Sequence, residues 1–189
     1  MNALIGRPDH GQPQVWAGAL AAYNNGDLHG AWIDVTSDLD EVMAAVQEVL
    51  STSPVKGEEE WDVMDTSNVV EGFRCSVEGA VLSVGICEAL KDAGQSDPRG
   101  LLGAYVDWQG ADTLTDPHDA AEEILDKLLG KYENLRHYAD EVAAEVLEQQ
   151  GITDGHFAYR FFNWASHAHD MDCNGDVHVS DEGYVFDCH

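Results

Sequence analysis

The sequence predicts an α+β fold, with strands near both ends of the chain and helices between them. Three observations support this class: an N-terminal pair of apolar stretches around an Asn-Gly turn, amphipathic helical periodicity in the last third, and a second hairpin pattern at the C-terminus. The length of 189 residues is enough to bury a core in one ordinary domain or in two or three small ones.

The N-terminal third is predicted to form a small α+β unit. Residues 1–13, rich in Gly and Pro, have no periodicity and indicate a flexible leader. Strands are expected over 15–22 and 30–35, joined by a tight turn at Asn25-Gly26, because both residues tolerate positive φ. A helix over 38–50 follows, with Ser37 or Asp38 as its N-cap, and 60–66 can return as a third strand.

Helices dominate the rest of the chain until its last hairpin. Small apolar residues interrupted by Gly predict weaker helices over 77–93 and 98–108. Clear amphipathic helices are expected over 117–129, capped by Asp116, and 135–149, capped by Asn134. An aromatic-rich helix over 155–171 and strands at 176–179 and 184–187 complete the expected elements.

These elements divide the chain into a leader and three small domains. The predicted divisions are the leader at 1–13, an N-terminal α+β domain at 14–70, a helical middle domain at 71–110, and a C-terminal α+β domain with the terminal hairpin at 111–189.

The composition is strongly acidic. The chain has 36 Asp plus Glu against 9 Lys plus Arg, a net charge of -27, while 44% of its residues are hydrophobic. An ordinary apolar fraction places this acidity on a folded surface, which repels nucleic acid and anionic membranes and attracts basic partners. No apolar run is long enough for a membrane span and the N-terminus lacks a signal-peptide core, so a cytoplasmic location is expected. The four cysteines form no C-x-x-C pair and are expected to be reduced, partly buried thiols.

Carboxylates form ordered rows on the two clearest helices. The residues expected to form an acidic recognition surface are Asp119, Glu122, Glu123 and Asp126 in one row, Glu141, Glu145 and Glu148 in another, and Glu58 and Glu59 before the third strand. Row neighbours lie about 5 to 6 Å apart, near the ~6 to 7 Å phosphate spacing of one DNA strand. The rows therefore suit a phosphate mimic, although salt-adapted proteins also carry acidic, lysine-poor surfaces.

The N-terminal segment carries a specific pattern of the form Tyr-Asn-x-Gly-x-Leu-x-Gly-x-Trp-x-Asp. The residues are Tyr23, Asn24, Gly26, Leu28, Gly30, Trp32 and Asp34. In this pattern the chain resembles the ArdA family of antirestriction proteins, and the likeness extends over most of 15–189. The resemblance implies an elongated chain of three small domains that forms a curved homodimer, imitates bent duplex DNA, and inhibits type I restriction-modification enzymes when mobile DNA enters a cell. It implies a protein that is not an enzyme and needs no cofactor.

Other functions remain open alternatives. Asp170, Asp172, Asn174 and Asp181 match part of a calcium-loop template, but a hairpin rather than an exit helix is expected after them. The spacing of the C-terminal His and Cys residues fits no zinc template. The alternatives are an acidic hydrolase or calcium-binding domain, and a halophilic binding module whose acidic surface serves solvation. A hydrolase requires perturbed carboxylates gathered in a pocket, whereas a decoy spreads them over a surface.

Overall fold

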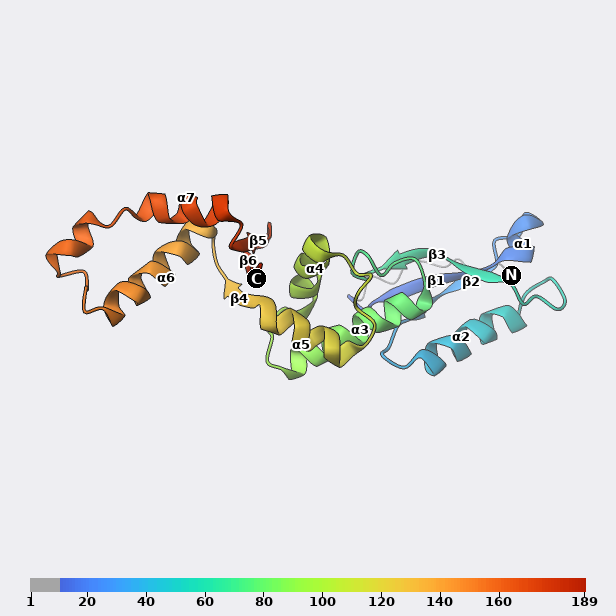
Figure 1. Cartoon of the computed structure of the whole chain (residues 1–189). Helices are drawn as coiled ribbons and strands as arrows, with labels where there is room; N and C mark the ends of the chain where they lie inside the picture. The colour runs from blue at the N-terminus through green and yellow to red at the C-terminus, as the bar shows by residue number, and fades with distance from the viewer. Residues whose placement is uncertain (1–10) are drawn as a thin grey trace. The chain divides into compact units, whose positions relative to one another are not determined.

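The computed structural model describes residues 11–189, so most of the predicted leader lies outside the described part (Figure 1). The chain forms two compact units, one ending at Glu122 and the other beginning at Glu123. Each contains helices and a three-stranded antiparallel sheet, which confirms the α+β class. The position expected for a boundary near residue 70 lies inside the first unit; the division into three domains stays a prediction.

The first sheet has the order β2-β1-β3, with β1 at Gln14–Ala19, β2 at Gly30–Asp34 and β3 at Trp61–Ser67. All six residues of β1 are buried, because it is paired on both edges and covered on both faces. The strands predicted over 30–35 and 60–66 are therefore confirmed to within a residue.

The predicted hairpin is wrong in one respect: the first strand ends at Ala19, and α1 (Leu20–Asn24) follows it. The physical reason lies far along the chain. The Glu58 carboxylate accepts hydrogen bonds from the backbone N–H groups of Ala21 (2.6 Å) and Ala22 (3.2 Å), which satisfies the donors at the start of this short helix.

Helix α2 (Leu39–Ser51) confirms the prediction for 38–50. Asp38 is its N-cap and accepts from the N–H groups of Asp40 and Glu41. The apolar side of α2 packs on β1 and β2 and buries Val42, Val46 and Leu50.

Two further helices, α3 (Val77–Asp92) and α4 (Pro98–Gln109), confirm the helical middle region. The glycines that lowered the expected helix propensity do not interrupt α3. Gly85 is buried, and a Cβ there would lie 2.9 Å from Cγ of Pro117, so the missing side chain allows close packing.

The second sheet has the order β4-β6-β5, with β4 at Leu128–Lys131, β5 at Val177–Val179 and β6 at Tyr184–Asp187. The terminal hairpin is confirmed, but β4 was not predicted. Helix α5 (Pro117–Lys127) consequently ends two residues earlier than expected. Leu128 and Leu129 continue the helical pattern of α5, but they form a strand because β4 pairs with the buried strand β6.

Between β4 and the hairpin lie α6 (Leu135–Gln149), as predicted with its Asn134 cap, and a divided aromatic region. The single helix expected over 155–171 is wrong: a 3₁₀ helix η1 (Phe157–Phe161) precedes α7 (Trp164–Asn174). Phe162 is extended, and the Asn163 side chain caps α7 by accepting from Ser166 N–H (3.2 Å), so the helix restarts there. No helix among the described residues is long and apolar enough to cross a membrane.

Candidate binding surface

The acidic residues lie on the surface almost without exception. None of those within residues 11–189 is buried, and the half-buried ones are Glu58, Asp140, Asp176 and Asp187. Since charged groups resist desolvation, this distribution agrees with the expectation that the acidity covers a folded core.

Helix α5 presents its predicted row to solvent. Asp119, Glu122, Glu123 and Asp126 are all exposed. The opposite side of the helix contributes the buried side chains of Ala120, Ala121 and Ile124. Burial of the apolar stripe therefore fixes which way the carboxylates face.

Helix α6 has the same organisation. Glu141, Glu145 and Glu148 are exposed, and the buried residues of the helix are Tyr138, Ala139 and Ala143. Three consecutive turns of one helix face thus carry negative charge.

The basic residues near these rows have partners outside them. Lys127 Nζ donates to the backbone carbonyl of His189 (2.6 Å), and Lys131 Nζ lies 4.2 Å from the centre of the Tyr184 ring. Arg136 pairs with Asp140 (2.8 Å). Each of these three cations thus makes a contact outside the two rows.

Glu58, which was assigned to the acidic surface, has a structural role. Besides the two amides of α1, its carboxylate accepts from Ser53 Oγ (2.8 Å). Desolvation raises the pKa of Glu58, but the hydrogen bonds from Ser53 and the two amides, with His29 nearby, outweigh it and lower the pKa below 4.5. Its neighbour Glu59 is exposed.

Several residues of the N-terminal pattern shape the first sheet. Gly26 has φ +90°, which favours glycine in the turn after α1. A Cβ at Gly30 would lie 2.6 Å from the Ala17 carbonyl oxygen and 2.9 Å from the Trp16 ring. Only a residue without a side chain fits beside the indole.

The aromatic and acidic members of the pattern lie on β2. The Trp32 ring packs edge-on against Trp16, with centroids 5.8 Å apart. The Asp34 carboxylate accepts from Nε2 of Gln14 (2.6 Å), a side chain that is only 4% exposed. Both side chains are therefore held in place by neighbours on β1.

Tyr23, Asn24 and Leu28 complete the pattern at the outer end of this sheet. Tyr23 is 57% and Leu28 71% exposed, and Asn24 is the last residue of α1. These side chains do not contribute to the core.

The carboxylates of the calcium-loop template do not form a loop. Asp170, Asp172 and Asn174 lie on α7, where alternate residues point about 200° apart, and Asp181 follows β5. Within residues 11–189 no three His, Cys, Asp or Glu side chains form a group that could hold a metal ion.

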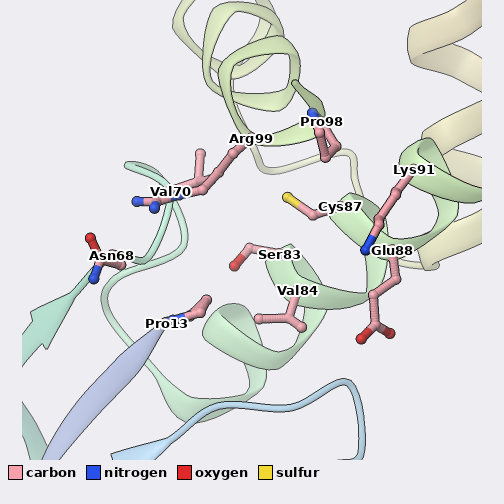
Figure 2. Close-up of a pocket in the computed structure, with 10 residues that line it drawn as sticks. All are labelled: Pro13, Asn68, Val70, Ser83, Val84, Cys87, Glu88, Lys91, Pro98 and Arg99. Carbon is pink, nitrogen blue, oxygen red and sulfur yellow. The ribbon is translucent and has the colours of Figure 1, made fainter. Parts of the chain in front are cut away.

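A pocket beside α3 in the first unit does not have the character of a hydrolytic site (Figure 2). It has a volume of about 150 Å³ and lies between α3, the start of α4 and the end of the sheet, with Cys87 and Ser83 directed into it. Desolvation raises the pKa of the Cys87 thiol to about 11, which disfavours the thiolate nucleophile. Glu88 is the one acidic side chain in its lining, and Figure 2 shows its carboxylate directed away from the pocket.

All four cysteines are free, as expected, although Cys75, Cys173 and Cys188 are exposed rather than partly buried. Cys173 Sγ lies 3.5 Å from Nε2 of His169, one turn earlier on α7.

The fold and this surface together define an acidic α+β protein with two carboxylate rows exposed on helix faces, one on α5 and one on α6. The family model of the antirestriction protein ArdA matches residues 15–186, nearly the whole chain, and the chain therefore belongs to the ArdA family of antirestriction proteins. A search of curated proteins gives no match.

Proposed function

We propose that this antirestriction protein acts as a decoy for double-stranded DNA and occupies the DNA-binding groove of a type I restriction-modification enzyme. The observation that carries the proposal is the exposure of both carboxylate rows, on α5 and α6, each opposite a buried apolar stripe. Carboxylates fixed on helices can bind the lysines and arginines with which an enzyme holds phosphates, because those contacts carry no sequence information.

The amount of charge matches the length of a DNA site. B-form DNA has one charge per roughly 1.7 Å of axis. If about half of the carboxylates of two chains, each with 36, faced the enzyme, they would match roughly 60 Å of duplex, or about 18 base pairs. A dimer would thus supply enough charge for an extended groove.

Assembly as a homodimer is part of this proposal. Phe157 and Phe161 of η1 are 73% and 74% exposed, with ring centroids 5.3 Å apart. An exposed aromatic pair on an otherwise acidic unit is a candidate for contact with a second copy, since it removes apolar surface from water.

The direct test is inhibition of DNA cleavage by a purified type I enzyme. We expect inhibition at near-stoichiometric amounts of the protein and competition with labelled DNA for the enzyme. Protein treated with a chelator, and then freed of it, should inhibit equally well. The proposal fails if the protein itself shifts labelled DNA in a gel, if it does not displace DNA from the enzyme, or if chelator treatment removes inhibition.

A further inference from the structure

A groove lies between β2 and α2, apart from the carboxylate rows of α5 and α6. Its volume is about 640 Å³. Residues 31–34 form its strand wall, and its helix wall runs along α2 from Glu41 through Ala45 and Glu48 to Thr52, the C-cap residue. The groove therefore follows a strand edge for most of that strand's length.

The charged residues that line the groove are all acidic. Asp34 belongs to the strand wall, and Glu41 and Glu48 belong to the helix wall. Trp32, which is half-buried, also lines the groove and lies two residues from Asp34, on the same face of β2. Carboxylates beside an indole form a suitable environment for the guanidinium of arginine, which pairs with the former and stacks on the latter.

The walls of the groove are held at both ends. At one end, Nε2 of His29 donates to the Val49 carbonyl (2.9 Å), which joins the loop before β2 to the last turns of α2. At the other end, Thr36 Oγ1 donates to the Glu41 carboxylate (2.9 Å). A groove fixed in this way loses little conformational entropy when a ligand binds.

The strand wall is also an open sheet edge. Ala19 N–H donates to the His29 carbonyl and Val35 N–H to the Pro13 carbonyl, so the odd-numbered residues of this strand direct their backbone groups to β1. The N–H and C=O of Trp32 consequently point outward. Within residues 11–189 no strand pairs with this edge of β2.

We infer that this groove binds an extended, arginine- or lysine-bearing segment of a partner protein, which pairs with the outer edge of β2 and places its basic side chains against the carboxylates that line the groove. Strand addition supplies affinity through backbone hydrogen bonds, and the acidic walls select a basic chain. A second copy of this chain fits poorly, because pairing two β2 edges would bring together the acidic walls of two molecules that each carry a net charge of -27. That the partner is the restriction enzyme rests on the proposed function. That the groove binds a basic segment does not depend on it.

The binding chemistry is tested on the full-length protein with a blocked peptide of alternating arginine and valine, five residues long. We expect the peptide to slow hydrogen exchange of the Trp32 amide. Two N-methylated versions of the peptide, one methylated at its arginine amides and one at its valine amides, keep the charge but lose backbone donors. Because alternate residues of an added strand donate to the sheet edge, at least one version should bind more weakly. Spermine, which has charge but no peptide backbone, should leave exchange at Trp32 unchanged.

The acidic walls are tested with the double variant Glu41→Gln, Glu48→Gln against the matched control Glu141→Gln, Glu145→Gln. Each pair removes two exposed helix charges, and the amide at position 41 can still accept from Thr36. Because the peptide can no longer form ion pairs with these two carboxylates, the groove variant should bind it about 2- to 30-fold more weakly, and the control should be nearly unchanged.

Each result decides between the two ideas. Equal weakening by both double variants, no slowing of exchange at Trp32, undiminished binding of both N-methylated peptides, or protection that rises with protein concentration without peptide would overturn the inference. A wild-type protein that fails to inhibit the restriction enzyme would refute the proposed function. The peptide experiment alone would then show whether the groove binds a basic segment. If wild type inhibits and the variant Glu41→Gln, Glu48→Gln inhibits as well as wild type does, the restriction enzyme does not use the groove.

Discussion

Removing the carboxylate row of α6 tests whether the charge acts as a distributed field or through one decisive contact. The perturbation is the triple variant Glu141→Gln, Glu145→Gln, Glu148→Gln. All three side chains are exposed, and the apolar side of the helix is formed by other residues, so the fold should be retained.

The magnitude follows from the exposure and spacing of these residues. An exposed ion pair is worth roughly 0.2 to 1 kcal/mol, so removing three of them weakens inhibition by about 3- to 150-fold, while a single variant changes it by less than about 6-fold. Relief of repulsion at 141/145 and 145/148 should also stabilise the fold by roughly 0.4 to 1 kcal/mol, at about 0.2 to 0.5 for each pair.

The assay measures affinity for the enzyme at several salt concentrations, together with thermal unfolding of each variant. The triple amide variant should show a weaker dependence of affinity on salt than wild type. The control is Glu141→Asp, Glu145→Asp, Glu148→Asp, which keeps the charge and should retain most of the inhibition. One single amide variant that remains folded but no longer inhibits would refute the distributed mechanism and indicate a discrete site.

Three other predictions concern stability and assembly. The pKa of the Glu58 carboxyl is lowered in the folded state, so the stabilisation from its ionised form is complete above its ordinary pKa of 4.5 and is lost as the pH falls through the folded-state pKa. In denaturant unfolding, Glu58→Gln should therefore destabilise the fold at pH 7 and much less at pH 3. The exposed control Glu59→Gln should not show this dependence on pH. Gly30→Ala should destabilise the fold by about 1 to 3 kcal/mol, because the new Cβ would meet the Trp16 ring and the Ala17 carbonyl oxygen. Gly103→Ala in α4 has open space around the new methyl group and should stabilise the fold by roughly 0.5 to 1 kcal/mol. The opposite order of stabilities in denaturant unfolding would contradict this packing of β1 against β2. Replacing both phenylalanines of η1 by serine should leave the fold intact and convert dimer to monomer in light scattering, and a dimer that persists would exclude this contact.

Elements whose signals are local were predictable from the sequence. The helix caps at Asp38 and Asn134 lie within three residues of the amides they bind, and the carboxylate rows of α5 and α6 follow from helical spacing alone. The Asn163 cap that divides the aromatic region is equally local and could have been recognised.

The remaining features depend on residues that are distant in sequence. Helix α1 is capped by Glu58, which is 37 residues beyond Ala21, and nothing near α1 indicates this contact. Strand β4 exists because it pairs with β6, more than fifty residues later. The groove requires β2 and α2 to be placed side by side by tertiary packing, so no pattern within either element predicts it.

The distant cap of α1 also has a consequence for synthesis on the ribosome. The N-terminus of a chain is synthesised first, so Ala21 and Ala22 are made well before Glu58. Likewise, β1 is made before β3, its second pairing partner. At about 5 to 20 residues per second, the 37 residues from Ala22 to Glu58 take roughly 2 to 7 seconds to add. Helix α1 lacks its cap until Glu58 has been added, and β1 has an unpaired edge until Ser67 at the end of β3 has been added. Folding of this part of the nascent chain therefore waits for translation of residues 58–67.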